Sequence, residues 1–236
     1  MKSIDVCLSP DLMHLYDVQD KAVVVVDILR ATSCMTTAVA HGVSSIKPVA
    51  EVDTCEALRE EGYLIAAERG GIKIDGFDFG NSPFEYISNE IKGKKIGVTT
   101  TNGTRAISLS KGAKTLLVGS FLNLSSVAKF LNQQEHDILI VCAGWKGHVN
   151  LEDTLYAGAL AEQLTAKFSR ACDSTLAAIT LYHAAKNDMM SFLQNSSHVQ
   201  RLKSLNIEKD IAFCLQLDQY DAVAVLEGDE LVKLKK

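Results

Sequence analysis

Three features are scarce in this chain: proline, surplus positive charge and long apolar runs. Three prolines occur in 236 residues, and no Gly/Ser-rich linker or internal repeat separates modules, which favours a single domain. The net charge of −5 argues against a general nucleic-acid or anionic-membrane binder, since those rely on basic surface. The longest apolar run, AVVVV before Asp27, is far short of the roughly 18 residues of a membrane-spanning helix. We therefore expect a cytoplasmic protein with no nucleic-acid or membrane partner.

Several catalytic and cofactor motifs are also missing. The chain has no Walker A sequence, no G-x-G-x-x-G after its first strands and no G-x-S-x-G, which disfavours nucleotide, dinucleotide and serine-hydrolase sites. The histidines lack zinc-hydrolase spacing, and the six cysteines lack C-x-x-C spacing, so we expect reduced thiols. A cysteine phosphatase would need C-x5-R, but the sixth residue after Cys142 is His148. Cys142 is therefore expected to be a small buried hydrophobe.

Apolar, β-branched runs alternate with amphipathic segments along the first two-thirds of the chain. Several of the runs are apolar on both faces, as in a parallel sheet that is covered by helices. Beyond residue 150 the pattern is helical to about residue 216, and 221–236 indicates a closing strand or hairpin. The predicted strands lie at 4–8, 22–29, 44–50, 63–68, 95–100, 114–119 and 137–144, and the predicted helices near 31–41, 53–61, 83–91, 103–111 and 123–134.

This alternation predicts an α/β fold of three layers, α/β/α, with a mostly parallel, mixed sheet and a helical C-terminal portion. Residues 1–236 would form one domain, with two lobes divided near residue 150 as the alternative. Thirteen of the fifteen glycines lie between Gly42 and Gly147, so we expect the functional site in the first two-thirds of the chain. The apolar helix faces beyond residue 150 could cover the sheet or form the interface of a homodimer.

Polar clusters recur at the carboxyl ends of predicted strands, where open α/β sheets bind ligands. In the first cluster, Asp27 ends a buried strand and Arg30 follows three residues later. A carboxylate there can hold Mg²⁺, which prefers oxygen ligands, and an arginine can bind phosphate through two N–H groups. The structural alternative is an ion pair between these two side chains.

The second cluster lies on the glycine-rich loop 66–86, whose length is typical of functional or flexible segments. Glu68 and Asp78 are candidate metal ligands or proton-transfer groups. Arg69 is a candidate anion clamp and Asn81 a candidate substrate-binding residue, and a solvated loop is the alternative for these charges. The loop ends in the sequence SPFE, which matches a capping box at the start of a helix.

Two further clusters each stand at the start of a predicted helix. In the stretch TTTNGTRA (99–106), free N–H groups of the first helical turn and adjacent hydroxyls can bind an anion. A simple N-cap by Asn102 is the structural alternative, although one cap does not require four threonines. Glu152 and Asp153 are candidate general acids or bases, or else partners of a helix dipole. The substrate-binding candidates in 99–106 are Thr100, Thr101, Asn102, Gly103, Thr104 and Arg105.

Four stretches resemble, in order and spacing, the 2-phosphosulfolactate phosphatase family: VVVVDILRATS, AERGGIKIDGFDFGNSPFEY, TTTNGTRA and CAGWKGHVNLEDTLYAG. The resemblance covers most of the first 160 residues. It implies a Mg²⁺-dependent α/β phosphatase that hydrolyses (R)-2-phospho-3-sulfolactate to 3-sulfolactate and phosphate, a step of coenzyme M biosynthesis in methanogens. Because similar proteins also occur in bacteria, the reaction class transfers better than the substrate does.

We therefore predict a metal-assisted phosphomonoesterase that acts on a small, anionic, phosphorylated substrate. Asp27 would be a metal ligand or nucleophile, and Glu68 and Asp78 would be metal ligands or proton-transfer groups. Mg²⁺ would neutralise phosphate oxygens and orient the attacking group. The alternatives are the same chemistry on another phosphorylated 2-hydroxy acid, and a non-catalytic module that binds a phosphorylated metabolite. The predicted anion clamps are Arg30, Arg69 and Arg105.

Overall fold

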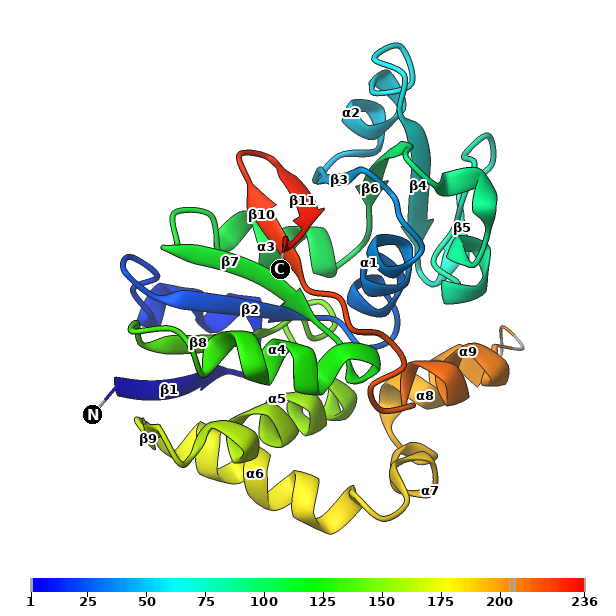
Figure 1. Ribbon diagram of the computed structural model, residues 1–236. Helices are drawn as coiled ribbons and strands as arrows, with labels where there is room; N and C mark the ends of the chain where they lie inside the picture. The colour runs from blue at the N-terminus through cyan, green and yellow to red at the C-terminus, as the bar shows by residue number, and fades with distance from the viewer. Residues whose placement is uncertain (1, 204, 206, 236) are drawn as a thin grey trace.

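A single twisted sheet runs through the computed structural model, which describes residues 2–203, 205 and 207–235 (Figure 1). The sheet has eleven strands in the described chain, in the order β5-β4-β6-β3-β11-β10-β7-β2-β8-β1-β9. The strands are β1 (Lys2–Cys7), β2 (Ala22–Val26), β3 (Ser45–Pro48), β4 (Leu64–Arg69), β5 (Ile72–Lys73), β6 (Lys95–Thr99), β7 (Thr115–Gly119), β8 (Ile138–Cys142), β9 (Phe168–Arg170), β10 (Ala224–Glu227) and β11 (Glu230–Lys233).

Most neighbouring strands are parallel, and the antiparallel pairs come from two hairpins. The β4–β5 hairpin lies at one edge of the sheet. The β10–β11 hairpin lies inside it, between β7 and β3, and pairs antiparallel with both (Figure 1). All seven predicted strands and the closing hairpin are confirmed, because apolar runs that fill both faces of a strand can only be buried within a covered sheet.

Helices cover both faces of the sheet. In β2, Val24 and Val26 pack into the core on one face of the sheet, which the helices after residue 120 cover. Val23 and Val25 pack into the core on the other face, which helices from the first 110 residues cover. This division follows from the alternation of side chains along a strand, and it confirms the three layers. The helices are α1 (Ala31–Ala40), α2 (Val52–Ala57), α3 (Gly103–Leu109), α4 (Leu124–Leu131), α5 (Leu151–Leu164), α6 (Asp173–Ala185), α7 (Met189–Leu193), α8 (Ser197–Lys203) and α9 (Glu208–Cys214).

The prediction of one helix at 83–91 was wrong. That segment forms two short 3₁₀ turns, η2 (Pro83–Tyr86) and η3 (Asn89–Ile91). Within the described residues, Ser82 makes no side-chain capping bond, and the Glu85 carboxylate instead accepts from the Gly80 N–H at 2.6 Å. Glu85 thus stabilises the loop before the turn, so the expected capping box does not form. Further 3₁₀ turns are η1 (Pro10–Leu15) and η4 (Phe121–Asn123).

The C-terminal portion is helical, as predicted, with one exception. Phe168–Arg170 forms the edge strand β9, which pairs with β1 and buries the Phe168 ring. Strands from both sides of residue 150 enter the same sheet. No helix in the described ranges is both long enough and apolar enough to cross a membrane.

Candidate active site

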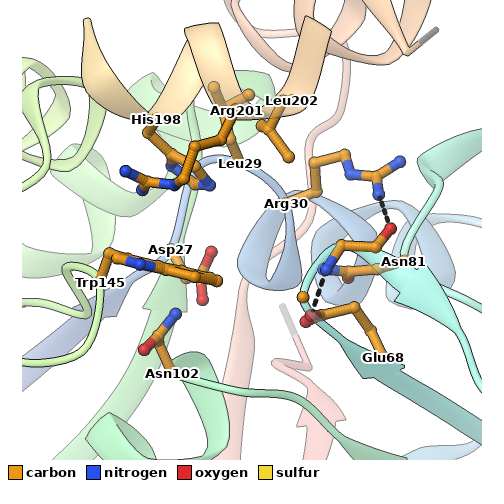
Figure 2. Close-up of a pocket in the computed structure, with 12 residues that line it drawn as sticks. Asp27, Leu29, Arg30, Glu68, Asn81, Asn102, Trp145, His198, Arg201 and Leu202 are labelled. Atoms are coloured by element: carbon orange, nitrogen blue, oxygen red, sulfur yellow. Dashed lines mark hydrogen bonds between the residues drawn. The ribbon is translucent and has the colours of Figure 1, made fainter. Parts of the chain in front are cut away.

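A cavity of about 110 Å³ opens at the carboxyl ends of β2, β4 and β6. Parallel strands bring these ends to one edge of the sheet, which is where ligands bind in open α/β folds. Figure 2 shows side chains of α8 on one side of the cavity and those of the strand ends on the other. Its lining residues are Asp27, Leu29 and Arg30 after β2, Glu68, Gly70 and Gly71 at the end of β4, Asn81, Asn102 after β6, Trp145 after β8, and His198, Arg201 and Leu202 on α8.

Asp27 is held at the first turn of α1. Its carboxylate Oδ1 accepts from the Ala31 N–H at 3.3 Å, and its own N–H donates to the Thr32 hydroxyl at 3.0 Å. Burial raises the pKa of Asp27 from 3.8 to about 6; the nearby His198 opposes this shift and Glu68 adds to it. Two carboxylates therefore influence one another across the cavity.

Glu68 is the last residue but one of β4, just before the turn into β5. Its Oε1 accepts from the Gly71 N–H at 2.7 Å and from the Thr101 hydroxyl at 3.0 Å. The turn requires the positive φ angles of 65° and 88° at Gly70 and Gly71, which favour glycine. The Glu68 carboxylate is thereby fixed toward the cavity (Figure 2). Thr101, in the 99–106 stretch, helps to fix it.

Arg30 is buried and does not pair with Asp27 in the hydrogen bonds and ion pairs of the described residues. Its guanidinium forms an ion pair with Asp210 of α9 and donates to the Gly71 carbonyl at 3.0 Å. The ion pair joins α9 to the loop after β2. The expectation that the site lies within the first two-thirds of the chain was therefore too narrow, because α8 and α9 complete it.

Glu152 and His198 form a buried pair beside the cavity. Glu152, in the first turn of α5, is fully buried, and its Oε1 contacts the His198 Nδ1. The Asn150 amide also lies 3.1 Å from Nδ1. Oε2 of Glu152 has no hydrogen-bond partner anywhere in 2–203, 205 and 207–235. A carboxylate that binds one ring nitrogen orients the imidazole, and the other nitrogen, Nε2, can then bind a ligand or transfer a proton.

Asp153, the next residue, is buried and accepts hydrogen bonds from the backbone, and its predicted role as an acid or base stays a prediction. Its two carboxylate oxygens accept from the Ile28 N–H at 2.9 Å and the Gly144 N–H at 3.0 Å. Burial raises the pKa of Asp153 well above 3.8, and the neighbouring Glu152 and Asp27 raise it further. Of the residues that the structure describes as lining the cavity, Asp153 is not one. It joins the loops that follow β2 and β8.

The threonines of 99–106 hold the start of α3. Thr100 Oγ1 accepts from the Thr104 N–H at 3.2 Å, and the Thr104 hydroxyl donates to the Thr100 carbonyl at 2.9 Å. Asn102 occupies the N-cap position, but within the part of the chain described here its side chain makes no capping bond. It lines the cavity, and its Oδ1 accepts from the Lys146 N–H at 3.2 Å. Thr100 therefore makes the capping hydrogen bond that was predicted for Asn102.

Gly103, the first residue of α3, packs tightly against Asp27 and the start of α1. A Cβ on Gly103 would lie 2.9 Å from the Asp27 Oδ2 and 2.8 Å from the Ala31 Cβ. Both distances are shorter than real Cβ contacts show. Only glycine fits there while the Asp27 carboxylate keeps its position.

Besides the residues near the starts of α3 and α5 described above, three predicted site residues do not line the cavity as the structure describes it. Arg69 donates to the backbone carbonyls of Glu68 and Ala50 and to the Thr99 hydroxyl. Asp78 pairs with Arg59 at 3.4 Å. Arg105 is half exposed and pairs with Asp11 at 2.6 Å. Their proposed roles stay predictions, whereas Asp27, Arg30, Glu68, Asn81 and Asn102 are brought together at the cavity.

The side chains at the cavity fit a magnesium ion better than a softer metal. No group of three His, Cys, Asp or Glu side chains in the described ranges forms a ready-made metal cluster. Mg²⁺ is commonly bound by one or two carboxylates, with water and substrate phosphate completing its shell. Asp27 and Glu68 supply two such carboxylates.

Cys142 is fully buried, and burial raises the pKa of its thiol well above 9.0. Both observations agree with its predicted role as a small buried hydrophobe.

The fold has three layers, and carboxylates, arginines and a carboxylate-bound histidine surround one cavity at the strand ends. This arrangement is typical of proteins that bind small anionic molecules, enzymes among them. The family model of 2-phosphosulpholactate phosphatase matches residues 7–229. A relative from Thermotoga petrophila is 41% identical over 223 residues, covering 94% of this chain and 95% of its own. One from Caldanaerobacter subterraneus subsp. tengcongensis is 39% identical over 217 residues, covering 90% of each chain. Both are named probable 2-phosphosulfolactate phosphatase.

The chain therefore belongs to the 2-phosphosulpholactate phosphatase family, and the predicted resemblance is confirmed. Membership makes the protein an enzyme of the phosphoric monoester hydrolase class. Sequence reasoning missed Trp145, His198, Arg201 and Asp210 as parts of the site. Trp145 directly follows the predicted strand 137–144, so its place at a strand end was a signal that could have found it. No local spacing relates His198, Arg201 and Asp210 to the strand ends, and only the family's coverage of residues beyond 170 would have pointed to them.

Proposed function

We propose that the protein hydrolyses (R)-2-phospho-3-sulfolactate to 3-sulfolactate and phosphate, with Mg²⁺ held by Asp27 and Glu68. The observation that carries the proposal is the cavity, which sets these two buried carboxylates opposite arginine and histidine side chains (Figure 2). A substrate with phosphate, carboxylate and sulfonate groups needs placed cations in a protein of net charge −5. The names of the relatives support this choice of substrate.

Bound Mg²⁺ would supply charge neutralisation at the phosphate oxygens. Asp27, with a pKa of about 6, is ionised at neutral pH and is held by the first turn of α1. Glu68 is fixed from two sides by Gly71 and Thr101. Because both carboxylates are anchored before a ligand enters, little side-chain entropy is lost when they bind a cation.

Arg30 would hold the phosphate. A guanidinium has five N–H donors, and the contacts with Asp210 and Gly71 use two of them. These contacts fix the plane of the guanidinium at the cavity wall, and we assign the remaining donors to phosphate oxygens. Charge-assisted hydrogen bonds of this kind are among the strongest in proteins.

His198 and Glu152 would deliver the proton that the leaving group needs. When Nδ1–H of His198 donates to Glu152, the carboxylate stabilises the protonated ring, and Nε2–H is the group that can give up a proton. Nε2 would donate that proton to the C2 oxygen of the substrate as the bond from this oxygen to phosphorus breaks. Glu152, predicted from sequence as the acid or base, would thus act through a histidine.

A phosphate-release assay tests the function. We expect turnover of phosphosulfolactate to exceed that of 2-phospholactate and of the two phosphoglycerates, to stop with EDTA and to recover when excess Mg²⁺ is added. Release that ignores the chelator would contradict the metal role of Asp27 and Glu68. Faster release from a phosphate ester without sulfonate would contradict the substrate. A role in coenzyme M synthesis, a cytoplasmic location and a homodimer stay predictions.

A further inference from the structure

The mouth of the cavity carries a second arginine. On α8, Arg201 follows His198 by three residues, so both lie on one face of the helix, and both line the cavity. Figure 2 shows the two side chains directed from α8 toward the side where Trp145 lies. His198 is buried whereas Arg201 is exposed. Arg201 therefore stands at the solvent side of a cavity whose inner side holds His198.

Trp145 fixes the Arg201 guanidinium. The guanidinium carbon lies 4.6 Å from the centre of the Trp145 ring, well within the range of a cation–π interaction. The same indole lies 5.8 Å from the His198 ring, tilted by 31°. Stacking uses the face of a guanidinium and sets the direction of its N–H bonds, which lie in the guanidinium plane. A stacked arginine is thus an oriented receptor for an anionic group with several oxygens.

The substrate has one anionic group that reaches farther than the others. Its carboxylate carbon is bonded to C2, which bears the phosphate ester, whereas the sulfur is bonded to C3 and so lies one bond farther away. With the phosphate at Asp27, Glu68 and Arg30, the sulfonate is the group that extends toward the mouth. In the described lining, the arginine that stands there is Arg201. A guanidinium is also weakly hydrated compared with an ammonium, which suits a sulfonate with its diffuse charge.

We propose that Arg201, oriented by Trp145, binds the sulfonate and makes the enzyme selective for sulfonated 2-phospho acids. This specificity role rests on the proposed phosphatase function. Arg30 then binds the phosphate, which every candidate substrate carries. Arg201 binds the sulfonate, which distinguishes one candidate substrate from another. Losing Arg201 would change which phosphate ester is preferred, and the chemistry itself would continue.

The test compares two substrates in the Arg201→Met variant, in which an unbranched side chain can still pack on the indole. We expect kcat/KM for phosphosulfolactate to fall about 10- to 100-fold, the range for a lost charge-assisted hydrogen bond, mainly through KM. Turnover of 2-phospholactate, which has no sulfonate, should change by less than about threefold. Lys203→Met is the matched control, because it removes the same charge from the same helix at a residue outside the described cavity lining.

Two results would overturn this assignment. An equal loss on both substrates would place Arg201 at the phosphate, at the carboxylate or in a purely structural role, and no loss on either would remove it from the site. Calorimetry with the product gives a readout independent of turnover. Wild type should bind 3-sulfolactate more tightly than lactate, and Arg201→Met should bind the two alike. If wild type shows this preference yet releases no phosphate, the proposed function fails while the sulfonate site stands.

Discussion

The substitution Gly103→Ala tests whether the position of the Asp27 carboxylate controls the reaction. The added Cβ would lie 2.9 Å from Asp27 Oδ2 and 2.8 Å from the Ala31 Cβ, and ordinary contact begins near 3.4 Å. Either the carboxylate or the first turn of α3 must therefore move by about 0.5 Å, since packed interiors have no spare room. A misplacement of 1 Å costs about 100-fold in rate, so half of that should lower kcat/KM by roughly tenfold.

Gly97→Ala is the matched control. Gly97 lies within β6 and is also tightly packed, with an added Cβ 2.6 Å from a methyl group of Leu58. Both substitutions overpack the interior and should cost about 1–3 kcal/mol of unfolding free energy, yet Gly97 has no contact of this kind with Asp27 among the described residues.

The two variants would be compared by urea unfolding and by kcat/KM for phosphate release. We expect similar losses of stability, with the loss of activity confined to Gly103→Ala. If Gly103→Ala keeps wild-type kcat/KM while its stability falls as far as that of the control, the Asp27 carboxylate can move without consequence. The reasoning that places it at the reacting phosphate would then be refuted.

Two further predictions concern buried charges. Because burial raises the pKa of Asp27 from 3.8 to about 6, its ionised form destabilises the fold, and stability present below pH 4 is lost as pH rises through 6. Asp27→Asn should therefore abolish turnover. In chelator-treated protein, the same substitution should raise the unfolding free energy by about 2–3 kcal/mol at pH 7.5 but leave it unchanged at pH 4. An equal change in unfolding free energy at both pH values would contradict this prediction. Asp210→Asn leaves the buried Arg30 without its ion-pair partner, which should cost about 3–5 kcal/mol in urea unfolding. Asp229→Asn breaks the exposed pair with Lys111 and should cost less than about 1 kcal/mol; similar losses for the two variants would contradict the difference in burial.

The parts of the site that could be predicted from sequence are those at strand ends. Asp27, Glu68 and Asn102 each follow an apolar run, and parallel strands bring such ends together whatever the distance between them in sequence. The pattern does not say where each side chain points. Glu68 and Arg69 are neighbours on one strand, so their side chains leave on opposite faces, and only Glu68 lines the described cavity.

The contribution of the C-terminal helices could not be predicted from local pattern. Asp210 pairs with Arg30 across 180 residues of sequence, and His198 meets Glu152 across 46. The position of α8 and α9 depends on how their apolar faces pack against the rest of the fold. Helix periodicity identifies the apolar face of a helix but not the part of the fold against which that face packs. Arg105 shows the same limit, since its helix turns it toward Asp11.

The hairpin β10–β11 has a consequence for how the enzyme is made. Asp27 follows β2 and Glu68 ends β4, and the hairpin lies between the strands that carry them, joining β7 on one side to β3 on the other. On the ribosome, residues 224–233 emerge after both of these parts of the sheet. The two parts of the sheet are therefore joined only when the last strands of the described chain pair, and such long-range pairing is slow. A nascent chain halted before residue 224 would lack this connection between the two carboxylates of the proposed catalytic centre and would depend on loop contacts such as the hydrogen bond from Arg30 to the Gly71 carbonyl.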